Sequence, residues 1–236
     1  MDHTESNDFE ILDTQSLDID EIIDSFSEKN KTRSGAKHHS HKSKHIDKKT
    51  AQQRSILSYL HDLVFGLVGL LLVLMLVFKV VIVSGPSMYQ TLKNGDCLIL
   101  LSNTFCGEPK QGDIIVAAKD SFKNGEPIIK RVIATEDQRV NIDFVNGIVY
   151  VDDKPLDEPY AYTPTNLFEG VTFPITVDEG CVFVLGDNRN DSKDSRSTEI
   201  GLIDCREILG KALIIAFPGV DPYSGEREFD RIGALW

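Results

Sequence analysis

One apolar run constrains this chain more than any other feature. No charged residue occurs from Leu63 to Phe78, and after Lys79 the apolar character continues from Val80 to Val83. At 1.5 Å per helical residue, the uncharged part covers about 24 Å and the whole stretch roughly 31 Å, which is the thickness of a bilayer core. Lys79, close to the end, can reach the interface with its long side chain. The run therefore predicts a transmembrane anchor at residues 55–83.

The segment before the anchor differs in composition from the rest of the chain. Residues 1–30 carry ten acidic side chains and one lysine, whereas residues 31–54 carry eight Lys or Arg and four His. Low apolar content predicts a disordered tail at 1–54. A solvated charge run is one interpretation of the basic block. Its place directly before an apolar span favours a topology signal, because Lys and Arg mark the cytoplasmic side.

The anchor is expected to stay in the mature protein. A cleaved signal peptide has a short basic region and a small-residue cleavage site, but here the preceding segment is long, and Val81-Ile-Val-Ser84 lacks the small-x-small pattern. We expect a single-pass protein of the cell membrane, with the N-terminus cytoplasmic and a domain at 84–236 outside.

Beyond the anchor, the pattern favours short strands rich in β-branched residues and bounded by Gly, Pro, Asn and Asp. The Asn146-Gly147 pair between apolar residues is typical of a hairpin turn. Helical periodicity is weak throughout the domain except at Asp204–Leu209, and Tyr160–Pro174 is irregular. The domain is thus predicted to be mainly antiparallel β, with strands at Cys97–Leu101, Asp113–Ala117, Pro127–Ile133, Gly147–Val151 and Cys181–Leu185.

Charge and cysteine content exclude some classes of function. From residue 80 onward there are 25 acidic and 15 basic residues, so nothing indicates a nucleic-acid surface. The four cysteines, Cys97, Cys106, Cys181 and Cys205, lack the close spacing of a zinc or redox motif. A disulfide is possible in a domain outside the cytoplasm, and a buried apolar role is the alternative.

A serine framed by glycine and proline follows the anchor, in Ser84-Gly85-Pro86-Ser87-Met88. A plain turn is one interpretation. A nucleophilic role for Ser87 requires a base beside it. All six histidines lie before or at the start of the anchor, so a Ser-His-Asp triad is excluded by the predicted topology. A lysine is the remaining base, as in known Ser-Lys variants.

Lys130 is the lysine that the pattern favours, since it lies among aliphatic residues in Ile128–Ile133. Strand alternation places Lys130 and Arg131 on opposite faces, so one cation must face an apolar side. Burial lowers the pKa of a lysine toward the range in which it can act as a base. An edge strand with two solvated cations is the alternative.

A dense polar loop, Gly186–Arg196, follows the strand that ends at Leu185. It could be a solvated turn, a calcium site without EF-hand spacing, or a hydrogen-bonded scaffold that orients a catalytic amine.

Together these stretches resemble bacterial type I signal peptidases, peptidase family S26. The matching motifs are Ser87–Leu92, Gly112–Val116, Lys130–Ile133 and the box Gly186–Arg196, in the family's order and spacing across about residues 60–217. The resemblance implies two antiparallel sheets behind one transmembrane helix. It also implies a serine endopeptidase that removes signal peptides from secreted preproteins after small-x-small sites such as Ala-x-Ala, without cofactor or metal. An apolar surface would rest on the lipid bilayer.

The resemblance also implies residue roles. Ser87 would be the nucleophile and Lys130 the general base. Ser192 would hydrogen-bond and orient the lysine amine, and Asp194 and Arg196 would form a supporting ion pair. The Ser87 backbone N–H would donate to the oxyanion. Shallow pockets for the small substrate side chains would be lined by Val81, Val83, Met88, Leu92, Val116 and Ile129.

Two stretches depart from the family pattern: Gln90 replaces a proline, and Ile133–Gln138 differs from the family's usual Gly-x-Pro-Gly-Asp turn. In addition, Gly85 stands where some members carry a hydroxyl donor. A self-cleaving Ser-Lys protease of the repressor type is a competing hypothesis, but the anchor argues against it. The other competitor is an inactive relative that acts as a membrane-anchored binding module. The pattern leaves the oligomeric state open.

Overall fold

The structure is a computed structural model, and it describes residues 43–120 and 122–235. It divides at Asp62 into two parts, each of which is described here by itself. Most of the predicted tail lies outside the described residues, although its last residues, 43–54, are helical. They belong to α2 (Ser43–Val77).

Helix α2 contains an apolar stretch, Ser55–Val77, that is long and apolar enough to cross a membrane by length and composition. The helix ends at Val77, and β1 (Phe78–Ile82) begins at the next residue. The predicted helical continuation to Val83 is therefore wrong, and β-branched residues explain the change, because Val80–Val83 favours an extended backbone. Lys79 donates through Nζ to Leu209 O at 3.1 Å.

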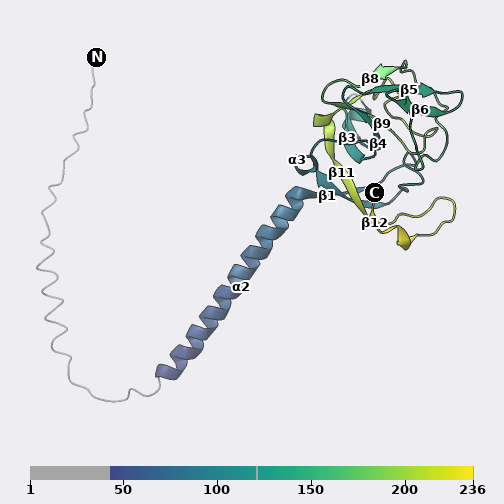
Figure 1. The fold of residues 1–236 in the computed structure, drawn as a ribbon. Coiled ribbons are helices and arrows are strands. Elements are labelled where there is room, and N and C mark those ends of the chain that lie inside the picture. Colours follow the sequence, from purple (N-terminus) through teal and green to yellow (C-terminus); the bar gives the residue numbers. More distant parts are fainter. Residues whose placement is uncertain (1–42, 121, 236) are drawn as a thin grey trace, which may run out of the picture. The chain divides into compact units, whose positions relative to one another are not determined.

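The larger sheet has eight strands in the order β1-β2-β11-β3-β4-β9-β10, with β12 also paired to β11. Figure 1 labels β1, β11, β3, β4 and β9 of this sheet. Every pairing is antiparallel. Strand β4 lies between β3 and β9, so the edge-strand alternative for Lys130 and Arg131 is wrong. The bounds are β2 (Cys97–Ser102), β3 (Ile114–Ala118), β4 (Pro127–Thr135), β9 (Cys181–Leu185), β10 (Ile203–Asp204), β11 (Ile208–Phe217) and β12 (Gly233–Ala234).

The smaller sheet has the order β7-β6-β5-β8 and is also antiparallel. Strands β5 and β6 form the hairpin that the Asn146-Gly147 pair predicted. The bounds are β5 (Arg139–Asp143), β6 (Ile148–Val151), β7 (Lys154–Pro155) and β8 (Ile175–Thr176); the short helices are α3 (Asn103–Cys106), η1 (Lys123–Gly125), η2 (Cys205–Glu207) and η3 (Phe229–Arg231).

The prediction of a mainly β fold with two antiparallel sheets is confirmed. Each of the five predicted strands corresponds to an observed strand. The helical tendency at Asp204–Leu209 is realised only as the short η2, because β11 begins at Ile208. One apolar cluster spans both sheets and includes Ile133 of β4 and Ile142 of β5.

Candidate active site

Ser87 lies in a tight turn, residues 84–92, between β1 and β2. Two backbone hydrogen bonds close it, from Tyr89 N to Pro86 O and from Leu92 N to Met88 O. Met88 and Leu92 are almost wholly buried in a core cluster. Because the buried Met88 and Leu92 side chains anchor the turn in the core, the position of Ser87 is fixed although Ser87 belongs to neither sheet.

Gly85 has φ +89°, in the left-handed region, and its N–H donates to Asn94 Oδ1 at 3.0 Å. An L-residue with a side chain is strained there. The turn thus gives a physical reason for glycine at the position where some family members were expected to carry a hydroxyl donor.

Lys130 reaches Ser87 from the middle of the larger sheet. Its Nζ is hydrogen-bonded to Ser87 Oγ at 2.7 Å and donates to Ile129 O at 2.9 Å. The side chain is almost fully buried, with 4% of the residue exposed. Burial lowers the pKa of Lys130 to about 8, against the opposing influence of the nearby Asp194 and Asp187 carboxylates. A neutral amine beside a serine hydroxyl is the arrangement that a Ser-Lys pair requires.

Arg131 occupies the opposite face of β4, as alternation predicts, and it too is buried. It donates to both carboxylate oxygens of Asp187, at 2.8 and 2.7 Å, and to Gly112 O. Asp187 Oδ2 also accepts from Thr91 Oγ1 at 2.5 Å. This link ties the end of the turn to the strand that carries Lys130. Neither Asp187 nor Thr91 was expected to be a site residue, although both lie inside the motifs that carry the family resemblance.

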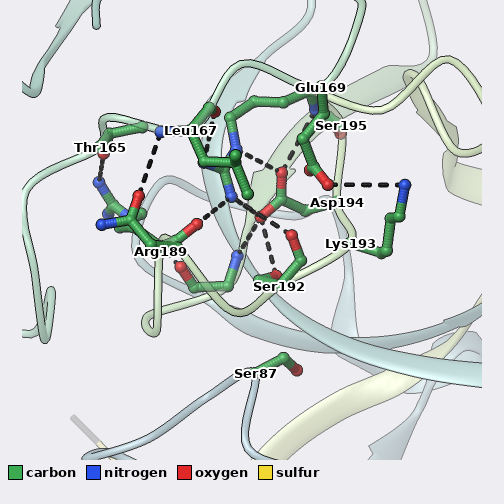
Figure 2. A network of polar contacts seen from close by, with 12 residues as sticks. Ser87, Thr165, Leu167, Glu169, Arg189, Ser192, Lys193, Asp194 and Ser195 are labelled. Carbon is green, nitrogen blue, oxygen red and sulfur yellow. Dashed lines mark hydrogen bonds and ion pairs between the residues drawn. The ribbon is translucent and has the colours of Figure 1, made fainter. Parts of the chain in front are cut away.

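The polar loop is an internally bonded scaffold. Asp194 pairs with Arg196 through two hydrogen bonds of 2.8 Å, and neither residue is exposed. Asp194 Oδ2 also accepts from Gly186 N at 3.0 Å and Ser192 Oγ at 2.8 Å. Figure 2 shows this network, with Ser87 to one side of it. The expected Asp194–Arg196 ion pair is therefore present.

Ser192 lines the same cleft as Ser87 and Lys130, but its proton goes to Asp194. Among the described residues, Lys130 Nζ makes its hydrogen bonds to Ser87 and Ile129, so the expected Ser192–Lys130 hydrogen bond does not form here. A Cβ on Gly186 would lie 2.1 Å from Ser192 Oγ. Only glycine leaves room for the Ser192 hydroxyl, which keeps lone pairs free to accept a further bond.

A cleft of about 550 Å³ surrounds the pair. Of the six residues expected to line substrate pockets, Val81, Val83, Met88 and Ile129 line it. Leu92 and Val116 do not; both are buried in the core cluster beneath. The irregular segment Tyr160–Pro174 contributes Leu167 and Glu169 to the cleft, and no pattern in the sequence indicated this.

Comparisons with known proteins identify the family of this chain. Residues 56–217 match the family described as signal peptidase, peptidase S26. This chain belongs to that family. The match covers the turn, Lys130 and the polar loop, and it supports assignment of the chain as a hydrolase of the signal peptidase I type.

Individual relatives align over most of their length. The chain is 38% identical over 163 residues to "Probable signal peptidase I-1" of Synechocystis sp., covering 64% of this chain and 79% of the relative. It is 30% identical over 180 residues to "Signal peptidase I" of Bacillus licheniformis, covering 73% and 94%. A solved signal peptidase I from Enterococcus faecalis aligns at 30% identity and a TM-score of 0.35, covering 44% of this chain and 96% of that one.

Proposed function

We propose that this chain is a membrane-bound serine endopeptidase that cleaves signal peptides from secreted preproteins after small-x-small sites, with Ser87 as nucleophile and Lys130 as general base. The observation that carries the proposal is the 2.7 Å contact between Lys130 Nζ and Ser87 Oγ inside the cleft. A hydroxyl nucleophile needs such a base within hydrogen-bond reach.

The chemistry follows from this contact. Neutral Lys130 takes the Ser87 hydroxyl proton while Ser87 Oγ bonds to the scissile carbonyl carbon. The resulting ammonium returns the proton to the leaving amine as the C–N bond breaks, which leaves an acyl-serine ester. Lys130 then takes a proton from water as the hydroxyl attacks the ester, and returns it to Ser87. The Lys130 amine thus accepts and then returns each proton that moves, in both acylation and deacylation.

The negative charge on the oxyanion of the tetrahedral intermediate must be stabilised by a hydrogen-bond donor. The Ser87 backbone N–H makes no hydrogen bond to another described residue, so it is free to donate to the oxyanion. A donor of this kind contributes a few kcal/mol to transition-state stabilisation.

The cleft also supports the proposed preference for small side chains. Its walls near Ser87 are aliphatic at Val81, Val83 and Ile129, and Met88 fills the space beneath. Short side chains such as Ala fit shallow apolar pockets, whereas larger ones require displacement of a buried neighbour.

Membrane attachment is proposed from α2 and from the surface that follows it. The Ser55–Val77 stretch has the length and composition of an anchor. Val80 of β1 pairs with Ile99, which pairs in turn with Ile214 of β11. Val80 and Ile214 are exposed, so this row gives the sheet an apolar face that suits a bilayer surface. The basic block before the helix favours a cytoplasmic N-terminus and an extracytoplasmic catalytic domain.

The test is processing of a purified preprotein with an Ala-x-Ala site by the full chain in detergent or lipid vesicles. Ser87→Ala and Lys130→Ala should each abolish cleavage. Ser224→Ala and Lys154→Ala change the same residue types at exposed positions away from the cleft, and both should cleave normally. Cleavage by Ser87→Ala at the wild-type rate would exclude the proposed nucleophile.

A further inference from the structure

The C-terminal segment, residues 218–235, follows β11 and lies beyond the part of the chain that matches the family. None of its described residues lines the catalytic cleft. It nevertheless turns back to the stretch that directly follows Ser87. A Cβ on Gly219 would lie 2.2 Å from Asn94 O, so the two backbones approach as closely as glycine permits.

Arg231 makes the most direct contact between the two. Its Nη2 donates to Thr91 O at 3.0 Å, at the end of the turn that carries Ser87. The same guanidinium binds both carboxylate oxygens of Asp96, at 3.1 and 2.7 Å. Asp96 is fully buried and also accepts from Lys93 N and Gly219 N. One planar guanidinium group thus joins the Thr91 carbonyl, near the end of the turn, to the buried Asp96 carboxylate.

Thr91 is held from its other side as well. Its side chain donates to Asp187, which binds Arg131, the neighbour of Lys130 in β4. The backbone of Thr91 is therefore fixed by Arg231, and its side chain by the scaffold of the general base. If Arg231 is removed, the Thr91 carbonyl loses this partner, and the polar contacts of Thr91 that remain are those of its side chain with Asp187 and Arg131.

Two further contacts keep the C-terminal segment in place. Lys93 Nζ lies 2.5 Å from Asp221 and 2.7 Å from Glu228, with 7% of its side chain exposed. The rings of Tyr223 and Tyr89 meet edge to face, with centroids 5.4 Å apart. Because a buried cation requires its partners, the segment cannot leave without exposing or stranding Lys93.

We propose that Arg231 is a positioning residue that holds the turn at Thr91, so that Ser87 Oγ keeps its contact with Lys130. This inference rests on the proposed function, because it assumes that Ser87 attacks the substrate. Loss of the contact lets the turn shift relative to β4, and a displacement on the order of 1 Å at a reacting group can cost about 10²-fold in rate. The cleft walls do not include Arg231, so substrate binding should change little.

The experiment measures kcat and KM separately for Arg231→Ala, with Arg227→Ala as the matched control. Arg227 lies on the same segment but donates to Pro218 O and packs over the Phe217 ring. We expect kcat of Arg231→Ala to be about tenfold lower than that of Arg227→Ala, and the two KM values to agree within about twofold. A tenfold loss corresponds to a displacement of Ser87 smaller than about 1 Å. Arg231→Lys should lie between wild type and Arg231→Ala, and millimolar guanidinium should restore part of the lost kcat.

Arg231→Ala also leaves the buried Asp96 carboxylate without its cation, so it could unfold. The double variant Arg231→Ala/Asp96→Asn removes that charge. Lys93 N and Gly219 N donate to different carboxylate oxygens of Asp96, so the single amide oxygen of the asparagine keeps one of these two hydrogen bonds. Thermal unfolding first shows that the double variant is folded at the assay temperature. Its kcat should then still be about tenfold lower than that of Arg227→Ala. A kcat equal to that of Arg227→Ala, or a loss confined to KM, overturns the role of Arg231. Cleavage by Ser87→Ala would instead overturn the proposed function.

Discussion

The pH dependence of cleavage offers the sharpest test of the Ser87–Lys130 pair. Only the neutral amine can take the serine proton, so activity must rise with pH through the pKa of Lys130. Burial lowers that pKa to about 8. The neutral fraction is then about one tenth at pH 7 and about nine tenths at pH 9.

The expected profile is a rise of kcat/KM by about tenfold from pH 7 to a plateau above pH 9. A solvated lysine with a pKa of about 10.4 would be neutral in roughly one molecule in 2,500 at pH 7, and its rate would still rise tenfold per pH unit at pH 9. The position of the plateau therefore separates a buried base from an exposed one.

The assay is hydrolysis of a fluorogenic peptide with an Ala-x-Ala site by the full chain in detergent, from pH 6 to 11 at constant ionic strength. Because kcat/KM reports the free enzyme, it is compared with the structure before substrate binds. Circular dichroism at each pH shows that the chain stays folded. A flat profile between pH 6 and 10 would refute Lys130 as base, and a midpoint above pH 10 would refute its burial.

Three further variants test the site. Lys130→Met removes an amine whose pKa is lowered by folding from 10.5 to about 8. Between these two pH values the unfolded chain binds more protons than the folded chain, so the wild type gains roughly 3 kcal/mol of stability as the pH rises through them. Urea unfolding at pH 7 and pH 10.5 should show this gain for the wild type and not for the variant. Asp194→Asn removes the carboxylate that most raises the pKa of Lys130, so the rise of activity with pH should begin at lower pH. The substitution also leaves the buried Arg196 without its carboxylate partner, so thermal unfolding should show a free energy of unfolding lower by about 3–5 kcal/mol. Leu92→Ala should cost about 2–5 kcal/mol of stability while leaving the preference for Ala over Val at the cleavage site unchanged, because Leu92 lies in the core.

Five of the strands could be predicted from the sequence because they depend on local pattern, and the same pattern pointed to Lys130. β-branched runs between turn residues indicate strands whatever lies beside them. Lys130 could be identified because a cation among aliphatic residues in a strand must be buried or lie at an edge. The position of β4 between β3 and β9 decides between these alternatives.

The end of the helix could not be predicted from hydropathy. Val80–Val83 is apolar enough for a membrane helix and β-branched enough for a strand. Pairing decides: Val80 lies opposite Ile99 and Ile82 opposite Cys97 in β2. Strand β11 was missed for a related reason, since Gly210 and Lys211 interrupt its apolar pattern; Gly210 is needed where a Cβ would lie 2.4 Å from Leu101 O.

The polar contacts were the least predictable part of the site. The Ser192 hydroxyl donates to Asp194 rather than bonding Lys130, and which acceptor a hydroxyl takes depends on differences of tenths of an ångström between neighbouring groups. Leu92 and Val116 were assigned to pockets because they are apolar and close in sequence to the motifs, but only three-dimensional packing separates a cleft wall from the layer beneath it.

Ser87 and Lys130 come from elements that are 43 residues apart, and this separation explains why so many ionic contacts surround a simple pair. Lys130 is fixed by the sheet, whereas the turn that carries Ser87 has no strand partner. Its position must therefore come from side chains and from neighbouring loops. Asn188 N holds Ser87 O at 3.0 Å, Asp187 holds the Thr91 side chain, and Arg231 holds the Thr91 carbonyl. Such contacts stabilise a single geometry when all partners are buried and satisfied, so the geometry of the proposed Ser87–Lys130 pair depends on residues that lie outside the cleft.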